Sequence, residues 1–581
     1  MKKPIVRRAL LSTAFADATD LHPILQRVYS ARGVQSITEL SHELGSLLPY
    51  DQLLGISAAA SCLADAVMAQ KSILIIGDFD TDGATSTALA VACLQSFGAQ
   101  KVEYLVPNRF EYGYGLTPEI VAVAAKKKPQ ILITVDNGIS SNAGVAAANA
   151  AGMAVVITDH HLPGKELPQA AAIVNPQQVG DIFPSKNLAG VGVIFYVMLA
   201  LRGELRQRNW FAQQNIPEPN MAQFLDLVAL GTVADLVPLD RNNRILVQQG
   251  LQRMRQNKMR PGIQALLAVA GRLPQRLVAS DLGFTVAPRL NAAGRLADMS
   301  LGIECLLATD PNVARELATK LSVLNEERRL IEQDMKQQAF AELKKIQLLN
   351  QKKETLGAGI CLFDESWHQG VIGLLASRVK DYLYRPVIVF APGNTAEELK
   401  GSARSIPGLH IRDVLDSLAS QYPELITKFG GHAMAAGLTV QRSAFAAFSQ
   451  AFAAEVAKQI DPLLLQDELL SDGELRINDF CLTLAAQLRQ ANPWGQAFPE
   501  PLFDGHFKIV DQRIVGNKHL KLTLTPKDST KQLDAIAFNI DIEAWPNHHA
   551  VYVHAAYRLD VNEYLGKSSL QLIVEQMDLI A

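Results

Sequence analysis

The sequence lacks the features that mark membrane proteins and disulfide-bonded secreted proteins. No apolar run approaches the roughly 20 residues that a helix needs to cross a bilayer. The five cysteines are odd in number, lie apart in apolar surroundings and form no C-x-x-C pair, which indicates buried thiols in a reducing compartment. Basic residues near the start precede Ala9–Ala16, but Ser12 and Thr13 interrupt this short apolar part, which argues against a signal peptide. We therefore expect a cytoplasmic protein without a membrane segment.

A large excess of charge of either sign is also missing. The formal net charge is −3, which argues against binding nucleic acid with the whole surface. The charge is uneven, however, because residues 241–280 contain no acid and eight basic residues: Arg241, Arg244, Arg253, Arg255, Lys258, Arg260, Arg272 and Arg276. This basic block predicts either a local track for phosphates or a solvated helix face that acids elsewhere in the fold balance. Charge alone leaves both interpretations open.

The length and the order of the predicted elements indicate an α/β multidomain protein. A chain of 581 residues is too long for one core, and 48% hydrophobic with 19% charged residues is typical of a folded protein. Residues 1–50 have the pattern of a small helical lead-in. Residues 51–205 follow a β-α-β-α-β pattern, with helices predicted near Thr85–Phe97, Thr117–Lys127 and Ser140–Ala151.

Three apolar runs in this region share one form, because each ends directly before an acid. Ser72–Gly77 precedes Asp78, Ile131–Val135 precedes Asp136, and Val155–Thr158 precedes the triplet Asp159-His160-His161. Short runs rich in Ile and Val, separated by Ala-rich helices, are typical of buried parallel strands. In such sheets ligands bind beyond the carboxyl ends of the strands. We therefore expect these carboxylates and imidazoles to meet at one site.

The densest acidic motif is Asp78-Phe-Asp80-Thr-Asp82-Gly83. In an extended chain these three carboxylates would lie on one side, where they repel one another unless a cation neutralises them. A calcium loop of the EF-hand type is excluded, because its twelfth position is Leu89 instead of Glu and no helix precedes Asp78. The motif therefore predicts a different metal site.

The set of predicted ligands indicates which metal and which chemistry. Carboxylates with imidazole and no cysteine favour Mn²⁺ or Mg²⁺ over structural Zn²⁺. Five or more acids with His160 and His161 exceed the needs of one ion. Two ions about 3.5–4 Å apart, sharing a carboxylate, fit better and suit an in-line phosphoryl displacement.

Three further motifs are weak individually. The segment Leu225–Pro238 has the pattern of a helix that ends in a loop bearing Asp235, which could be a cap or a ligand. Ser402 and Arg404 offer a hydroxyl and a guanidinium that suit a phosphate. Gly430 and Gly431 before His432 would let the backbone approach a ligand closely.

The second half of the chain predicts a connector and two more domains. The charged, proline-free residues 312–353 carry apolar residues at helical spacing, which fits one long helix or a two-helix hairpin. A second α/β pattern begins after Gly357. The last 100 or so residues contain short alternating segments, such as Leu520–Thr525 and Leu533–Phe538, that indicate a small antiparallel barrel.

These motifs, in this order, resemble the DHH phosphoesterase superfamily, and the match covers essentially the whole chain. It rests on the acidic motif and the triplet, and also on Pro107–Arg109, Tyr114–Leu116, Val228–Asp235, Pro288–Arg295, Trp367–Gly373, Ser377-Arg378, Ser402, Arg404, Gly430–His432 and Pro493–Pro501. Phe79, Thr81 and Gln369 stand where the family usually has Tyr, Ala and Pro. None of these departures removes a charge or a ligand.

The resemblance implies a domain organisation. Residues 1–50 would be the lead-in, 51–305 a parallel-sheet DHH catalytic domain, and 306–353 a connecting helix. Residues 354–460 would form a second α/β domain (DHHA1) that binds substrate. Residues 461–581 would form an oligonucleotide-binding (OB) β-barrel, which smaller members of the superfamily lack.

The resemblance also implies an activity, namely two-metal 5′-to-3′ hydrolysis of single-stranded DNA to mononucleotides in recombination and repair. Asp82, Asp136, His160 and Asp235 would hold one Mn²⁺ or Mg²⁺ ion, and Asp78, Asp80 and Asp136 the other. His161 would lie near the scissile phosphate, and Asp159 and Asp136 would complete the catalytic set. Substrate phosphates would be held by Arg109, Arg289, Arg378, Ser402, Arg404, Gly431 and His432. The barrel would stack bases on Phe507 or Phe538.

Two other functions fit parts of the pattern. A small-nucleotide phosphodiesterase of the same superfamily would need neither the barrel nor the basic block. A degenerate accessory protein would have lost metal ligands, whereas every acid and histidine of the pattern is present. The resemblance suggests a single-strand-binding protein and a helicase as partners, and we expect a monomer.

Overall fold

The computed structural model divides the chain into two compact units, and each is described by itself. The smaller unit holds Met1–Pro4 and Leu324–Leu469, and the larger holds Ile5–Val323 and Leu470–Ala581. The structure describes residues 3–11, 15, 21–107, 115–349, 357–393, 395–465, 467–516, 518–540, 545–547, 550–564 and 566–580, without the side chains of residues 342, 344–349, 462, 463 and 564.

A five-stranded parallel sheet organises the first part of the larger unit. Its strand order is β3-β2-β4-β5-β6, and every neighbouring pair is parallel. The strands are β3 (Val102–Leu105), β2 (Ile73–Gly77), β4 (Ile131–Val135), β5 (Ala154–Thr158) and β6 (Ala172–Val174). All residues of β2 and β4 are buried, as the continuous apolar runs predict.

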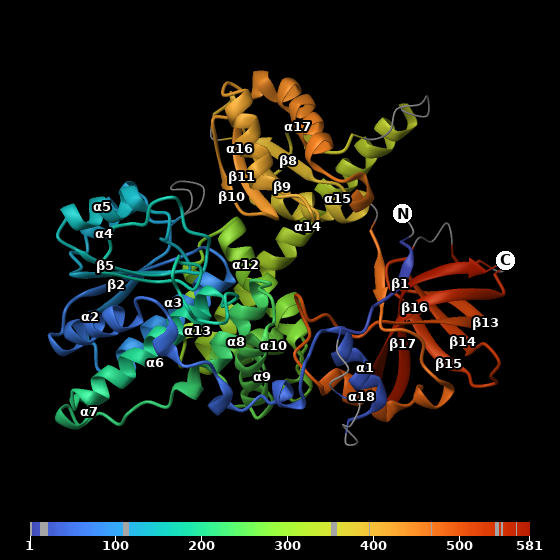
Figure 1. The fold of residues 1–581 in the computed structure, drawn as a ribbon, viewed down its shortest axis with the longest axis horizontal. Coiled ribbons are helices and arrows are strands. Elements are labelled where there is room, and N and C mark those ends of the chain that lie inside the picture. Colours follow the sequence, from blue (N-terminus) through green and yellow to red (C-terminus); the bar gives the residue numbers. More distant parts are fainter. Residues whose placement is uncertain are drawn as a thin grey trace. The chain divides into compact units, whose positions relative to one another are not determined.

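Helices cover both faces of this sheet (Figure 1). On one face, alternate strand residues such as Leu74, Leu132 and Val155 share a core with α4 (Pro118–Ala125) and α5 (Asn142–Ala150). The other face contacts α2 (Ile56–Met68), α3 (Thr81–Ser96) and α6 (Gly190–Gln207).

The start of α3 corrects one expectation. We predicted the helix near Thr85, with Asp82 in an extended chain beside Asp78 and Asp80. In the structure α3 already begins at Thr81, because Asp80 is its N-cap and accepts a hydrogen bond from the Gly83 amide at 3.0 Å. Asp82 therefore lies in the first helical turn and not on the same side of an extended strand.

The rest of the larger unit's core is helical. The helices α8 (Leu225–Ala234) and α9 (Arg241–Arg255) cross closely, since a Cβ at Gly250 would lie 2.2 Å from the Leu225 carbonyl oxygen. A π-helical turn at Leu282–Val286 contacts α8 and leads into α12 (Ala287–Leu296). Within the described residues, no helix has the length and apolarity that crossing a bilayer requires.

The connector is a single helix, α14 (Pro311–Leu349), of 39 residues, so the hairpin alternative is wrong. At a rise of about 1.5 Å per residue it spans about 58 Å. The boundary between the two units falls within this helix, after Val323.

The smaller unit contains a mixed sheet with the order β10-β11-β9-β8-β7. Only β7 and β8 are parallel among these pairs, and the other three pairs are antiparallel. The strands are β7 (Ile360–Phe363), β8 (Val387–Pro392), β9 (Glu398–Arg404), β10 (Lys428–Gly431) and β11 (Ala435–Gln441). Three helices, α15 (Ile372–Leu383), α16 (Ile411–Gln421) and α17 (Phe445–Gln459), contact these strands.

The predicted barrel is present and closed, but it is not wholly antiparallel. Its order is β13-β14-β15-β17-β16, and β15 pairs with β17 in parallel. The strands are β13 (Phe503–Val515), β14 (His519–Pro526), β15 (Leu533–Ala537), β16 (Tyr552–Tyr564) and β17 (Lys567–Ile580). Phe507 is only 1% exposed, so the prediction that it stacks on bases is wrong, whereas Phe538 is 51% exposed.

The lead-in is not purely helical, which corrects a second expectation. Beside α1 (Pro23–Ala31) it contains a strand, β1 (Ile5–Arg7), that pairs with β12 (Leu469–Ser471). Arg7, the last residue of β1, donates a hydrogen bond to Asp504 of the barrel at 2.8 Å. The partners lie more than 450 residues apart in sequence, so no local pattern could show this pairing.

Candidate active site

The ends of β2, β4 and β5 bring the predicted acids and histidines together. These three strands are neighbours in the sheet, and Asp78, Asp136 and the triplet at 159–161 directly follow them. Three groups of potential metal ligands have their donor atoms within 4.8 Å of one another: Asp82 with His160 and Asp235; Asp136 with His160 and His161; and Asp78 with Asp80 and Asp136. All seven residues named in these groups were predicted from the sequence.

His160 is at the centre of the first two groups. Its Nε2 lies 3.1 Å from Asp136 Oδ1, 3.4 Å from Asp235 Oδ2 and 3.9 Å from Asp82 Oδ2. The three carboxylates come from different elements, since Asp82 is in α3, Asp136 follows β4 and Asp235 is the C-cap of α8. A nitrogen surrounded by three carboxylate oxygens at these distances is an arrangement that one cation can bridge.

Backbone amides of α6 fix the position of Asp82. The Gly190 amide donates to Oδ2 at 2.6 Å and the Val191 amide donates to Oδ1 at 2.9 Å. The carboxylate thus sits against a helix N-terminus, where anionic groups are stabilised. This contact joins two helices that are about 100 residues apart in sequence, and the sequence analysis did not find it.

Two glycines make room for the acids. A Cβ at Gly190 would lie 2.6 Å from the Asp136 Cβ, and a Cβ at Gly231 would lie 2.9 Å from Asp82 Oδ1. Both distances are shorter than side-chain packing allows, so the site requires glycine at these positions. The Gly-Ala-rich composition near them was the only signal in the sequence.

Asp136 adopts a left-handed backbone conformation with φ of 62°. Non-glycine residues rarely occupy this region, and those that do are concentrated at functional sites. The turn lets Asp136 join both the group with His160 and His161 and the group with Asp78 and Asp80. Asp136 is therefore the one carboxylate that belongs to two of the three ligand groups.

Asp159 belongs to none of the three groups and instead holds the loop of the triplet. Its Oδ1 accepts from the backbone amides of His160 at 2.8 Å and His161 at 3.1 Å, and its Oδ2 accepts from the Ile139 amide at 2.9 Å. The same Oδ1 lies 2.7 Å from Nδ1 of the His161 ring. Asp159 thereby sets the orientation of both histidines.

Electrostatics show that the site favours a cation. Burial, followed by repulsion from Asp235, raises the pKa of Asp82 to about 7. Burial and the charge of Asp80 raise the pKa of Asp235 to about 8. Burial and the neighbouring carboxylates, Asp82 first, also raise the pKa of Asp136 well above its usual value. Such carboxylates ionise together only when positive charge neutralises them.

The pair of Asp159 and His161 behaves differently. Burial would raise the pKa of Asp159, but the charge and hydrogen bond of His161 outweigh it and lower the pKa to about 2. Burial would lower the pKa of His161, but Asp159 outweighs it and raises the pKa to about 9. Asp159 is therefore anionic and His161 cationic at neutral pH.

The donors fit Mn²⁺ or Mg²⁺. The three groups offer carboxylate oxygens and imidazole nitrogens only, and the cysteines of the chain take no part in them. Five acids crowd one small region in which burial disfavours their charges. Divalent cations would remove this unfavourable free energy.

Helix α12 supports the acidic loop. Asn291 Oδ1 accepts from the Thr81 amide at 2.8 Å and from the Thr81 hydroxyl at 2.9 Å. A Cβ at Gly294 would lie 1.8 Å from the Phe79 carbonyl oxygen, so the helix touches the loop backbone. On the same helix Arg289 donates to the Thr285 carbonyl at 2.5 Å. Arg109 lies outside the described residues.

The other predicted substrate-binding residues lie in the smaller unit. Arg404 Nη1 donates to Ser402 Oγ at 3.1 Å. Arg404 is paired in register with Ala435 of β11, and the Ala435 carbonyl accepts from the His432 amide at 2.8 Å. Gly431, with φ of 145°, has no room for a Cβ, which would lie 2.4 Å from Ala436 Cα. Ser402, Arg404, Gly431 and His432 are thus neighbours at one end of the mixed sheet.

Arg378 has a role that the sequence analysis did not show. Its Nε pairs with Glu332 Oε1 of α14 at 3.0 Å, and Glu332 also pairs with Arg328. A buried glutamate therefore orients Arg378, whose side chain stays 56% exposed. An oriented and accessible guanidinium suits a phosphate.

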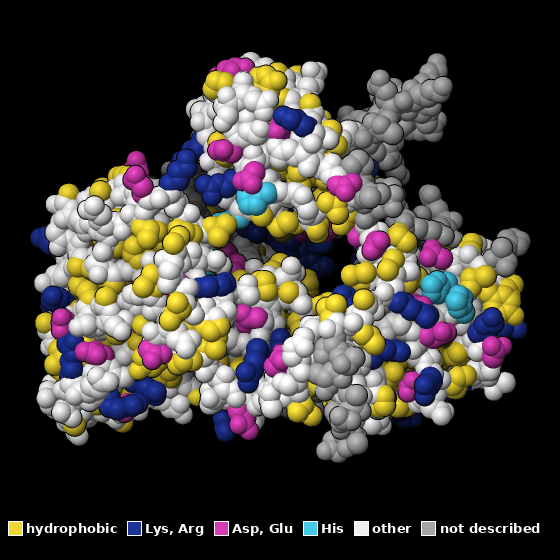
Figure 2. All heavy atoms as spheres, in the orientation of Figure 1, with side chains coloured by type: hydrophobic (Ala, Val, Ile, Leu, Met, Phe, Trp, Pro, Cys, Tyr) yellow, Lys and Arg dark blue, Asp and Glu magenta, His cyan; other side chains and the backbone are white. Residues whose placement is uncertain are grey.

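Much of the basic block serves the fold. Arg244 is buried over the Phe498 ring, Arg260 pairs with Asp226 at 3.1 Å and Arg272 pairs with Asp281 at 3.2 Å. Figure 2 likewise shows Lys and Arg interspersed with Asp and Glu on the face it presents. The interpretation of balanced charges is therefore right for part of the block.

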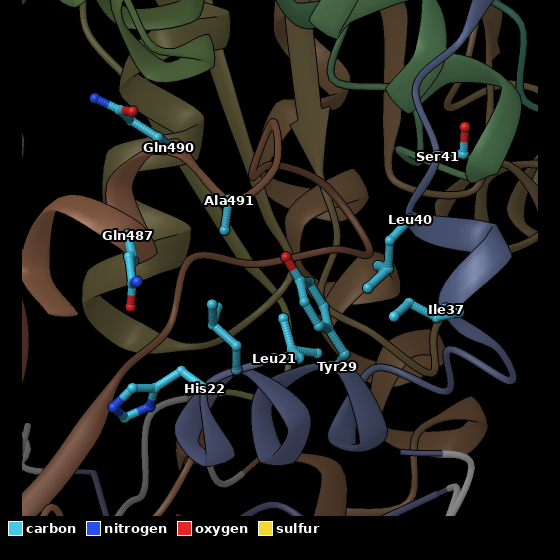
Figure 3. Close-up of a pocket in the computed structure, with 10 residues that line it drawn as sticks. Leu21, His22, Tyr29, Ile37, Leu40, Ser41, Gln487, Gln490 and Ala491 are labelled. Carbon is cyan, nitrogen blue, oxygen red and sulfur yellow. The ribbon is translucent and has the colours of Figure 1, made fainter. Parts of the chain in front are cut away.

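A cavity of about 610 Å³ lies elsewhere, between α1, the segment 37–41 and α18 (Leu482–Gln490). Figure 3 shows Tyr29 and Leu40 on one side of it and Gln487 and Gln490 on the other. None of its lining residues belongs to the metal-ligand groups, and no carboxylate is among them. This cavity is separate from the candidate active site.

Three family models match the chain in order. They are the DHH family N-terminal domain over residues 72–232, the DHHA1 domain over residues 356–458 and the RecJ OB domain over residues 471–576. The first match contains all the acids and histidines of the three groups except Asp235, which follows its end.

Whole proteins match as well. The single-stranded-DNA-specific exonucleases RecJ of Salmonella typhimurium and Escherichia coli are both 52% identical to the chain, over 99% and 98% of each sequence. The crystal structure of RecJ from Thermus thermophilus in complex with Mn²⁺ matches with a TM-score of 0.80 at 28% identity, covering 100% of this chain and 79% of that one. The complex of the same protein with Mg²⁺ matches with a TM-score of 0.74 at 26% identity.

Proposed function

Because the chain belongs to the RecJ family of single-stranded-DNA-specific exonucleases, we propose that its cluster of acids and histidines is the site of phosphodiester hydrolysis. The chain is a metal-dependent exonuclease of the DHH superfamily that acts on single-stranded DNA. The observation that carries the assignment is the convergence of Asp82, Asp136 and Asp235 within 4 Å of one nitrogen of His160.

Two ions occupy this site in our proposal. Asp82, Asp136, His160 and Asp235 hold one, and Asp78, Asp80 and Asp136 hold the other. When bound, Mn²⁺ or Mg²⁺ supplies the positive charge that activates water and offsets the charge of the phosphate. The presence of Asp136 in two of the ligand groups supports the shared role.

His161 contacts the substrate in our proposal, and Asp159 acts through His161. Asp159 holds the His161 ring through the 2.7 Å contact and keeps it protonated. The His161 imidazolium then donates a hydrogen bond to an oxygen of the scissile phosphate, where it stabilises the charge that develops during attack. Asp159 is thus a positioning residue.

The remaining predicted residues hold the strand. Arg109, Arg289, Arg378, Ser402, Arg404, Gly431 and His432 bind its phosphates in our proposal, and digestion proceeds from the 5′ end to mononucleotides. The domains are those expected from the resemblance: the lead-in at 1–50, the DHH domain at 51–305, the connecting helix at 306–353, the DHHA1 domain at 354–460 and the OB barrel at 461–581. The paired Ser402 and Arg404 support a phosphate contact in the DHHA1 part.

The cellular setting follows from the substrate. The protein acts in DNA recombination and repair, and we propose that it works in the cytoplasm as a monomer. A single-strand-binding protein and a helicase that supplies unwound ends are the proposed partners.

Substitution of Asp136 tests the assignment. The Asp136→Asn variant should lose at least a hundredfold in activity on a 5′-labelled single strand and bind less Mn²⁺, because both proposed ions lose a ligand. The variant should bind the strand without metal as the wild type does, and its Tm should be unchanged. Asp416→Asn, at an exposed position of α16, is the matched control and should behave as the wild type. Wild-type cleavage by Asp136→Asn in Mn²⁺ would refute the shared-ligand assignment.

One comparison separates this function from that of a small-nucleotide phosphodiesterase. The exonuclease should turn over a long single strand with a much lower KM than a dinucleotide, because the barrel and the arginines contact only the long substrate. Equal KM values for both substrates would favour the phosphodiesterase.

A further inference from the structure

A second cavity, of about 360 Å³, lies within the larger unit where the helical core meets the barrel. The end of α9 and the segment 275–278 form one wall, α18 forms another, and β16 and β17 close it. Its charged lining consists of Arg255, Arg276, Arg489 and Glu563. No residue of this cavity belongs to the metal-ligand groups described above.

Two arginines of the basic block line this cavity. Arg241, Arg244, Arg260 and Arg272 contact carbonyl oxygens, a ring or carboxylates elsewhere. Arg255 and Arg276 instead face the cavity, where Arg489 of α18 joins them from a distant part of the sequence.

Arg255 and Arg489 form an electropositive pair. Arg255 Nε donates to the Leu277 carbonyl at 2.8 Å, which directs the rest of its guanidinium. Within the described part of the chain, no carboxylate forms an ion pair with either arginine. Both arginines line the same cavity, where their like charges repel each other, and burial followed by the charge of Arg489 lowers the pKa of Arg255. An anion between them would relieve this repulsion.

The third arginine is held by the barrel. Arg276 pairs with Glu563 of β16 across the cavity. This pair leaves one of three guanidinium groups neutralised and two available. Gln275, Gln490 and Ser568 add hydrogen-bonding groups, and apolar side chains such as Leu277 and Val561 complete the lining.

We propose that this arginine cavity binds backbone phosphates of the single strand between the helical core and the barrel. The proposal rests on the proposed function and names a binding site outside the metal centre. Guanidinium forks match the oxygens of a phosphate, and the apolar lining can contact sugars and bases. We favour DNA phosphates over the carboxylates of an acidic protein as the ligand, because the single-stranded DNA on which the family acts carries a row of phosphates.

Salt dependence measures the contact directly. Binding of a 40-nucleotide strand is measured without divalent metal, so that failure of the metal assignment cannot affect it. For single strands, log K falls with log salt by about 0.7 per phosphate contacted. Arg489→Gln should lower the slope by about this amount, and Arg255→Gln together with Arg489→Gln by about twice as much. Lys258→Gln, an exposed basic position nearby that does not line the cavity, is the matched control.

Cleavage of substrates of two lengths locates the effect. The double variant should raise KM for the 40-nucleotide strand about tenfold, with kcat unchanged, and should leave KM for a trinucleotide unchanged. Glu563→Gln should act in the opposite direction and lower KM for the long strand, because it frees Arg276. The Arg489 side chain forms no hydrogen bond with the described residues, so Arg489→Gln should fold and keeps the test valid even if Arg255→Gln unfolds.

Three results would overturn the proposal. The first is an unchanged salt slope in the folded Arg489→Gln variant. The second is an equal loss on the trinucleotide. The third is unaltered binding of DNA with lost binding of a polyglutamate peptide, which would assign the cavity to an acidic protein partner.

Discussion

Glycine leaves the space in which the acids of the site lie close together. Gly190 stands against Asp136 while its amide donates to Asp82, so one backbone position serves two ligands. That these acids lie together could be predicted from the sequence, because an acid directly after a buried strand has few structural reasons to be there. The role of Gly190 could not be predicted, because it depends on the contact of α6 with the loop after β4.

Substitution of Gly190 tests this dependence. Gly190→Ala should weaken Mn²⁺ binding at least tenfold, about 1.4 kcal/mol, because its Cβ would displace Asp136. Activity should fall in proportion at low Mn²⁺ and recover partly when the ion is in excess. Gly164→Ala is the control, since a Cβ there would have no neighbour closer than 3.7 Å. Titration calorimetry with Mn²⁺ gives the comparison, and equal affinities for both variants would contradict the role of Gly190.

Helices and strands were predictable where the pattern is local. The three parallel strands follow from their apolar runs, and the position of Asp235 at the end of α8 follows from its helical pattern. The early start of α3, the parallel pair in the barrel and the pairing of β1 with β12 did not follow. A capping side chain decides the first, and contacts between distant segments decide the other two. Local periodicity contains neither kind of information.

The contact of α12 with the start of α3 provides a test at this scale. Asn291→Ala leaves the Thr81 amide without its acceptor and the buried Thr81 hydroxyl with the Ala287 carbonyl alone, which should cost about 1–3 kcal/mol. We expect the Tm of the larger unit to fall by several degrees and Mn²⁺ affinity to fall with it, because Asp80 and Asp82 flank Thr81. Asn149→Ala, whose side chain bonds Gln169 at an exposed position, should change the Tm little. Thermal unfolding followed by fluorescence, with and without Mn²⁺, decides the matter.

At the scale of the whole molecule, one helix links two compact units with different chemistry. The larger unit contains the acidic centre, the barrel and the arginine cavity, and the smaller unit contains the paired Ser402 and Arg404. Under the proposed function, an acidic centre that binds metal ions and separate basic sites that bind phosphates would act on one anionic strand without a large net charge. The net charge of −3 is therefore consistent with an enzyme that acts on DNA.

The acidic centre also links the stability of the molecule to pH. Folding raises the pKa of Asp82 to about 7 and that of Asp235 to about 8, above the value of about 3.9 in an unfolded chain. The folded metal-free protein therefore holds more protons than the unfolded chain, so this contribution to stability is present below about pH 4 and is lost as pH rises through 7 and 8.

Without metal, the Tm should be lower at pH 8.5 than at pH 6. Mn²⁺ should raise the Tm more at pH 8.5, because it binds the ionised carboxylates. Asp82→Asn should flatten the pH dependence of the metal-free protein, whereas Asp416→Asn should not. A metal-free Tm that rises from pH 6 to pH 8.5 would show that the carboxylates are already neutralised by the protein itself, and the case for a cation-dependent centre would fail.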